Sequence, residues 1–185
     1  MANTTFRGNL RAVSGIEQIS ISSSTGAVTT NLDIDSSGNI TTTGYVSAYD
    51  NVSSITSATK SVESTDSGTV FTLNRAAGIV ITLPTAAAGY NYTFIVGTTF
   101  TGAGQINTDN SSDLFSGFAH IFDPATATDM NTFIPDASDD DTIDLGTAGQ
   151  GWLVGGVIRL VATTAAVWHC EAFLHGDGTL ATPFE

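Results

Sequence analysis

The densest run of side chains able to do chemistry is acidic. Residues 136–144 contain Asp136, Asp139, Asp140, Asp141 and Asp144. Carboxylates at this density are the hard oxygen ligands that calcium prefers, although the run lacks the glycine and glutamate spacing of an EF-hand loop. Two interpretations stay open. Either Asp139, Asp140, Asp141 and Asp144 hold calcium, which neighbouring subunits could share, or the run is a solvated loop of mutually repelling charges.

Two histidines and a glutamate share one face of an expected strand. In residues 167–175, alternation places His169, Glu171 and His175 on the same side. Residues two positions apart on that side lie about 7 Å apart, a separation that zinc or nickel could bridge. His175 follows Glu171 by four positions, so it would have to fold back to join them. The alternative is an exposed polar stripe without a metal.

Nucleophilic catalysis has little support in the sequence. Cys170 is the one cysteine, which excludes an intrachain disulfide and a cysteine-based zinc site. It alternates with Trp168 on the expected core side, so we interpret it as a small buried hydrophobe. His120 is expected to alternate away from Phe118 and Phe122 and to be a hydrogen-bonded structural residue. Neither a Gly-x-Ser-x-Gly motif nor a glycine-rich phosphate loop is present, so no enzyme and no cofactor are predicted.

The charge of the chain narrows the classes of partner. Its 185 residues include 18 Asp and Glu but 5 Lys and Arg, a formal net charge of −13. This excess repels phosphate, so nucleic acid and anionic membranes are poor partners. The longest weakly polar run, residues 152–161, is interrupted by glycine and arginine and is too short to span a bilayer. No signal-peptide pattern opens the chain, and we expect a protein made in a reducing cytoplasm.

The elements that position these residues are expected to be strands. The chain has 29 Thr and 18 Ser but one Lys and four Glu, so the usual residues of surface helices are scarce. Threonine suits a pleated, half-buried surface, and the 19 glycines suit turns. No stretch longer than three turns carries an apolar stripe of helical period. The sequence therefore predicts an all-β protein.

Residues 61–185 are expected to form the body. About eight expected strands are separated by Gly, Asn and Asp, a density typical of a β-sandwich or jelly roll. A hairpin loop is expected at residues 74–78, between the first two strands. The expected strands are residues 69–73, 79–83, 92–96, 105–107, 115–122, 142–145, 152–161 and 167–175.

Residues 1–60 are expected to form an extended N-terminal β-arm with short hairpins. They hold three basic and four acidic residues, against two and fourteen in residues 61–185, and they are poor in large apolar side chains. Such a segment buries little on its own, so it should dock on another surface or be completed by other chains. The boundary is drawn within a polar stretch, residues 56–63. Residues 21–30 can be laid over residues 34–43 as an imperfect repeat, or they are two ordinary hairpins.

Several segments resemble virion proteins of tailed phages. Residues 63–73, 78–84 and 89–96 resemble small proteins of the capsid-decoration (cement) type, and the opening residues 1–8 resemble the arm that starts such proteins. Residues 32–44 are similar to the short repeats of phage fibres. The resemblance implies a virion structural protein on the outer capsid surface, made in the host cytoplasm. It also implies a homotrimer that stabilises the shell by bridging subunits of the major capsid protein.

The attachment residues are predicted from the arm. Arg7 and Arg11 are two of five cations, and Phe6 and Leu10 lie beside them. Apolar anchors with charge suit a short arm that orders on a surface by coupled folding. We predict that these four residues bind the capsid, with a frayed terminus as the alternative. A fibre or receptor-binding module contacting the host surface is the alternative function, and a metal-binding cupin-like domain is a third possibility.

Overall fold

The strands of the chain form three sheets in two separate units. The computed structural model describes residues 16–21, 28–34, 40–42, 51–126, 129–136 and 138–185. The units are residues 1–49 and residues 50–185, the second of which we call the body. The helices among the described residues are two short 3-10 turns, η1 (Ser64–Asp66) and η2 (Ala148–Gln150). The all-β prediction is confirmed.

The first unit is a sheet of three antiparallel strands. Its order is β1 (Ile16–Ile21), β2 (Val28–Ile34) and β3 (Ile40–Thr42). β1 pairs with β2 from Ile16 opposite Ile34 to Ile21 opposite Val28, and β2 pairs with β3. The two segments of the imperfect repeat thus contribute to two successive antiparallel pairings, as ordinary hairpins would.

The body contains a sheet of seven strands and a sheet of four. The order of the larger sheet is β11-β10-β14-β13-β8-β6-β4, and that of the smaller is β12-β9-β7-β5. The larger sheet comprises β4 (Asn51–Ile55), β6 (Thr69–Leu73), β8 (Asn91–Val96), β10 (Leu114–Phe122), β11 (Met130–Phe133), β13 (Val157–Ala162) and β14 (Val167–His175). The smaller sheet comprises β5 (Thr59–Ser61), β7 (Val80–Thr82), β9 (Gln105–Asn107) and β12 (Thr142–Asp144).

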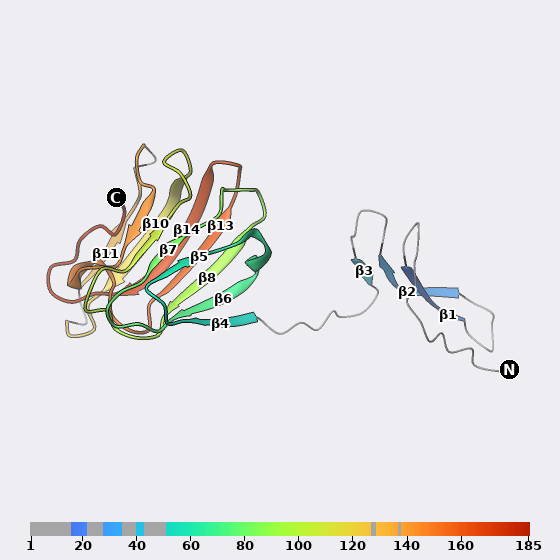
Figure 1. Cartoon of the computed structure of the whole chain (residues 1–185), viewed down its shortest axis with the longest axis horizontal. Coiled ribbons are helices and arrows are strands. Elements are labelled where there is room, and N and C mark those ends of the chain that lie inside the picture. The colour runs from blue at the N-terminus through green and yellow to red at the C-terminus, as the bar shows by residue number, and fades with distance from the viewer. Residues whose placement is uncertain (1–15, 22–27, 35–39, 43–50, 127–128, 137) are drawn as a thin grey trace. The chain divides into compact units, whose positions relative to one another are not determined.

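From β4 to β9 the chain alternates between these two sheets. β4, β6 and β8 pair in parallel in one sheet, while β5, β7 and β9 pair in parallel in the other. Figure 1 shows β6, β8, β13 and β14 side by side, with β5 and β7 in the second layer. A jelly roll is built from antiparallel strands, so this part of the body departs from the predicted jelly-roll pattern.

The hairpin predicted at residues 74–78 is wrong. β6 pairs with β4 on one side and β8 on the other, so neither of its edges is free to receive β7. Residues 74–78 instead carry the chain across to the second sheet. Their backbone stacks on the neighbouring connections, because the Asn74 N–H donates to the Ile55 carbonyl at 2.8 Å and the Thr101 N–H donates to the Ala76 carbonyl at 2.6 Å.

The position of β4 and β5 bears on where the body begins. Both strands lie within residues 51–61 and pair with strands of the body, whereas the sequence suggested that the body starts at residue 61. The polar stretch at residues 56–63 contains β5 and the buried Val62. Both strands lie at sheet edges, where most of their side chains face solvent, so their sequences are polar and do not indicate strands.

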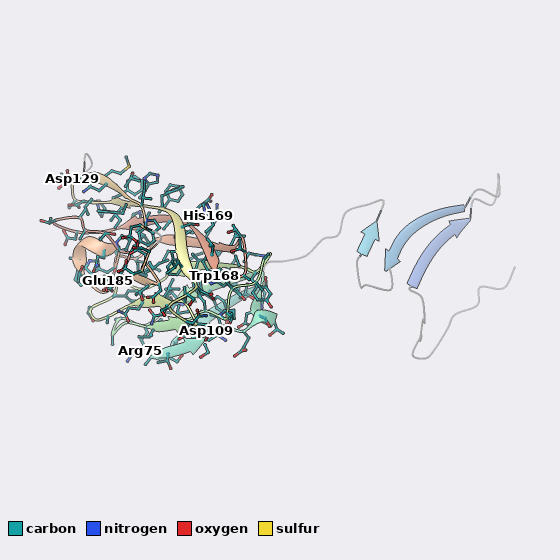
Figure 2. The ribbon with its side chains drawn as sticks, turned by 90° about the horizontal axis from the view of Figure 1, so that it is seen from above. Arg75, Asp109, Asp129, Trp168, His169 and Glu185 are labelled. Carbon is teal, nitrogen blue, oxygen red and sulfur yellow. The ribbon has the colours of Figure 1, made fainter. Side chains whose placement is uncertain are left out.

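One apolar core lies between the two sheets of the body. On β14 the side chains of Trp168, Cys170, Ala172 and Leu174 are fully buried, which confirms the predicted alternation of this strand. Trp168 packs against Tyr92 of β8, with ring centroids 5.7 Å apart. Trp168 and its neighbour His169 are labelled in Figure 2; Trp168 belongs to the core and His169 to the opposite, partly exposed face.

Gly117 permits the close parallel pairing of β10 with β14. Its φ of 103° lies where L side chains are strained, and a Cβ built there would collide with the carbonyl oxygen of Cys170 on β14. Gly68 has a φ of 87°, and a Cβ built there would have no other atom within 4 Å. A side chain at Gly68 would therefore add backbone strain alone, whereas one at Gly117 would add both backbone strain and a steric collision.

We predict that Gly117→Ala lowers the free energy of unfolding by about 2–4 kcal/mol and that Gly68→Ala lowers it by about 1 kcal/mol. The first variant adds a collision between strands to the strain, whereas the second adds strain alone. Thermal unfolding followed by circular dichroism measures both. Equal losses in the two variants would show that the β10–β14 contact does not need a glycine.

None of the helices among the described residues combines the length and apolar character needed to cross a membrane.

Candidate functional site

The acidic run folds into a cluster of three carboxylates. One oxygen from each of Asp136, Asp139 and Asp140 lies within 4.8 Å of the others. Within residues 51–126, 129–136 and 138–185 this is the one group of three or more acidic, histidine or cysteine side chains gathered closely enough to hold a metal. Asp140 is buried, whereas Asp136 and Asp139 are exposed.

Local hydrogen bonds shape this cluster. The Asp136 N–H donates to the Asp140 carboxylate, while the Ser138 N–H and hydroxyl both donate to Asp136 Oδ1 at 2.8 Å. The Ser138 N–H, followed by its hydroxyl, lowers the pKa of Asp136 below its ordinary value. These contacts account for the turn without any ion, and all three carboxylates could still contribute oxygen ligands.

The predicted set of four calcium ligands is divided by the structure. Asp139 and Asp140 belong to the cluster, and Asp136 joins them in place of Asp141 and Asp144. The Asp141 carboxylate accepts the Thr142 hydroxyl at 3.0 Å, and Asp144 Oδ1 accepts the Gly146 N–H at 2.6 Å. Both side chains therefore serve local turns around β12.

A groove of about 460 Å³ borders the cluster. Asp136 and Asp140 line one part of it, and Phe133 and Phe184 contribute apolar walls. Phe184 is held in place because it bridges to Ile143, next to the backbone hydrogen bonds that join Thr142 and Glu185 in both directions. The groove offers carboxylate oxygens and apolar surface, without a histidine or cysteine among its lining residues.

The predicted histidine–glutamate stripe lies on the outer face of the seven-stranded sheet. His169 Nε2 lies 3.9 Å from Glu171 Oε1, and Ser116 Oγ lies 3.5 Å from His169 Nδ1. His175 Nδ1 instead lies 3.1 Å from the Val154 carbonyl oxygen. The three residues are not gathered as a metal site, and the arrangement matches the alternative of a partly exposed polar stripe.

His120 lies on the same outer face, which corrects one expectation. Phe118 and His120 are two residues apart on β10 and therefore share a face, with ring centroids 4.8 Å apart. The prediction that His120 points away from Phe118 is wrong because strand alternation has a period of two. The expected structural hydrogen bond is present, since His120 Nδ1 lies 2.8 Å from the Thr132 hydroxyl oxygen on β11.

Cys170 is buried in the core, as predicted. Burial, with a smaller contribution from the charge of Glu171, raises the pKa of its thiol to about 12. The thiol therefore stays protonated near neutral pH, and this position suits packing rather than nucleophilic attack.

The predicted capsid-binding residues Phe6, Arg7, Leu10 and Arg11 lie outside the described residues. No family model and no curated protein matches the chain.

Sequence reasoning missed two features of this surface. It placed Asp136 in the acidic run but not among the ligands, because only the folded turn brings it next to Asp140. It also missed the aromatic cluster of Phe118, His120 and Phe173 on the outer face. The alternation of side chains along β10 and β14 could have shown which residues of each strand share a face. The sequence did not show that these two strands pair in parallel.

We predict that Asp139→Asn raises the thermal stability of the protein in a chelating buffer. The change removes one of three neighbouring negative charges and keeps an oxygen to accept the Ser138 hydroxyl. Asp144→Asn, outside the cluster, is the matched control. The melting temperature is measured with and without added calcium. A destabilising Asp139→Asn that also abolishes a calcium-induced rise would instead show that the cluster holds the ion.

We predict that acid weakens the fold partly through Asp66. The Glu63 N–H, and after it Lys60 at 3.2 Å, lower the pKa of Asp66 below 3.8. A lowered folded-state pKa contributes stability that is present above about pH 4 and is lost as the pH falls through the folded-state value. Between pH 7 and pH 3 the wild type should therefore lose more melting temperature than Asp66→Asn. The exposed Asp177→Asn is the control, and identical losses in all three proteins would contradict this assignment.

Proposed function

We propose that this chain is a virion structural protein that decorates the outer capsid of a tailed phage and stabilises it by bridging major capsid subunits. The observation that carries the proposal is the division of the chain into a small antiparallel sheet that follows the N-terminal residues and a larger two-sheet body. An attachment segment joined to a separate β-body is the organisation that the resemblance implies.

The distribution of charge on the body also supports this role. Of the fourteen acidic residues in residues 61–185, Glu171 alone lies in a strand of the seven-stranded sheet. The others lie in loops, in η1, in the short β12 and at the C-terminal end. Loops with net negative charge favour solubility for a surface displayed in many copies.

The partners follow from the same proposal. The major capsid protein would receive the N-terminal residues, and we expect a homotrimer, in solution or on the particle, formed through the N-terminal unit of residues 1–49. These assignments extend the resemblance and stay predictions.

The alternative is a fibre or receptor-binding module. An exposed aromatic platform at Tyr90, Tyr92 or Trp152 would favour it, because sugar rings stack on aromatic side chains. Tyr92 is 1 % exposed and donates its hydroxyl to the Glu63 carbonyl, and Tyr90 and Trp152 pack partly buried against the core. These three residues thus give the alternative no support.

We predict that deleting residues 2–14 abolishes capsid binding and leaves the body folded. The deletion removes Phe6, Arg7, Leu10 and Arg11 but no strand that the structure describes. Purified protein is mixed with capsids that lack it, and bound protein is measured by co-sedimentation. The circular dichroism spectrum should keep its β-sheet character.

A second variant distinguishes the loss of these four side chains from the shortening of the chain. In it the same four residues are replaced together by serine, and it should bind as poorly as the deletion. Binding of either variant at the occupancy of the full-length protein would contradict the assignment. Attachment would then lie in the body, at the loops around residues 98–112 and 136–144.

A further inference from the structure

The outer face of the seven-stranded sheet is unusually apolar for a surface that faces solvent. Phe173 of β14 is 48 % exposed and Val161 of β13 is 42 % exposed. Strand alternation places nine further apolar side chains on this face, at exposed or partly exposed positions. They are Val52, Val70, Ile95, Leu114, Phe118, Phe122, Met130, Val157 and Val167.

Some of these apolar side chains are register neighbours across the strands, in rows that also contain polar and charged residues. Register places Phe173 beside His120 on one flank and beside Val157 on the other, and the row continues through Ile95 of β8. The neighbouring row runs through Glu171 and Arg159 toward β6 and β4, where Val52 is 63 % exposed. Exposed apolar side chains gathered on one face around a charged pair are typical of an interaction surface.

Aromatic rings occupy the part of this face over β10 and β14. Phe118 meets Phe173 edge to face, with ring centroids 6.2 Å apart, and His120 lies 5.5 Å from Phe173. The hydrogen-bonding contact between His120 and Thr132 holds the imidazole in this group. Rigid aromatic side chains already packed against one another lose little conformational freedom on binding, which is the character of interface anchors.

The same face is electrically neutral in a strongly acidic protein. The strands of the seven-stranded sheet contain one acidic residue, Glu171, and one Lys or Arg, Arg159, whereas the chain as a whole has a formal charge of −13. Two copies of such a chain repel each other over most of their surface. On this face that repulsion is absent, so copies can approach here at the lowest electrostatic cost.

We propose that the outer face of the seven-stranded sheet binds the same face of a second copy of this chain. Seven strands about 4.8 Å apart and about 20 Å long give a plan area of roughly 600 Å², close to the roughly 800 Å² per partner of a standard interface once protruding side chains are counted. Two apolar sheet faces pack against each other as they do inside a β-sandwich. The same face on another copy matches this one in size, neutrality and apolar character.

The charged pair on the face fits a symmetric contact. Arg159 and Glu171 are register neighbours on β13 and β14. Neither of the two ion pairs found among the described residues includes Arg159; they join Lys60 to Asp66 and His169 to Glu171. About a two-fold axis, Arg159 of one copy can face Glu171 of the other, and each pair is formed twice.

The experiment is a measurement of molar mass for the full-length chain over a range of concentrations, by light scattering after size exclusion. Phe173→Glu and Val161→Glu each place an unpaired charge in the contact, so they should halve the mass of the wild-type assembly or raise its dissociation constant by roughly tenfold or more. Ala76→Glu, at an exposed side chain in the crossing between β6 and β7, is the matched control and should keep the wild-type mass. Circular dichroism confirms that each variant is folded.

A charge exchange tests the face without removing apolar surface. Arg159→Glu and Glu171→Arg should each weaken association, and the double variant should restore it, because the opposite charges again face each other between copies. Three results would overturn the proposal: a wild type that stays at 19.1 kDa at every concentration, a molar mass unchanged by the glutamate variants, or weakening by single charge variants that the double variant does not reverse. This inference does not depend on the proposed capsid role, since it is measured without capsids.

Discussion

A single apolar core shared by two sheets is the constraint on which the body depends. Because the chain alternates between the sheets from β4 to β9, both sheets are built from the same stretch of chain. Most side chains that fill the space come from strands far apart in sequence, such as Phe71 stacked on Phe94, with ring centroids 5.4 Å apart, and Tyr92 against Trp168. The connections are therefore short crossings over the edge of the core, and they stack on one another through backbone hydrogen bonds.

The same constraint separates two kinds of surface. The inward-facing side chains of the seven-stranded sheet form the core with the smaller sheet. The side chains of its outer face are not needed for that core, and many of them are apolar as well. The acidic residues are displaced to the loops and short elements, where Asp136, Asp139 and Asp140 meet at one groove. A neutral face on an acidic body gives the protein one surface through which two copies can associate, while the negative charge of the rest of the surface makes copies repel each other.

Much of the body could be predicted from local patterns. β9 and β14 coincide with the expected ranges, as does β6, because their apolar alternation is regular and their ends carry turn residues. β13 begins at Val157 rather than at residue 152, since the chain makes a turn at Gly155, whose φ is 98°. β4, β5 and β11 were missed because edge strands with mostly exposed side chains show little apolar alternation.

Strand pairing and the candidate site were harder to predict. Residues 69–83 read equally well as a hairpin or as two strands of different sheets, and the choice is made by β8 and β4 occupying both edges of β6. Likewise, the acidic run does not show which carboxylates converge. Asp136 reaches Asp140 through a local turn, whereas Asp141 and Asp144 are held by their own neighbours on β12.

We propose that this chain is a component of the outer surface of a virus particle. The most direct test of this proposal is labelling of intact, purified particles with an antibody raised against the body, residues 50–185, viewed by electron microscopy. The account predicts regular label over the capsid shell. Label confined to the tail or its fibres, or no label on particles at all, would contradict it.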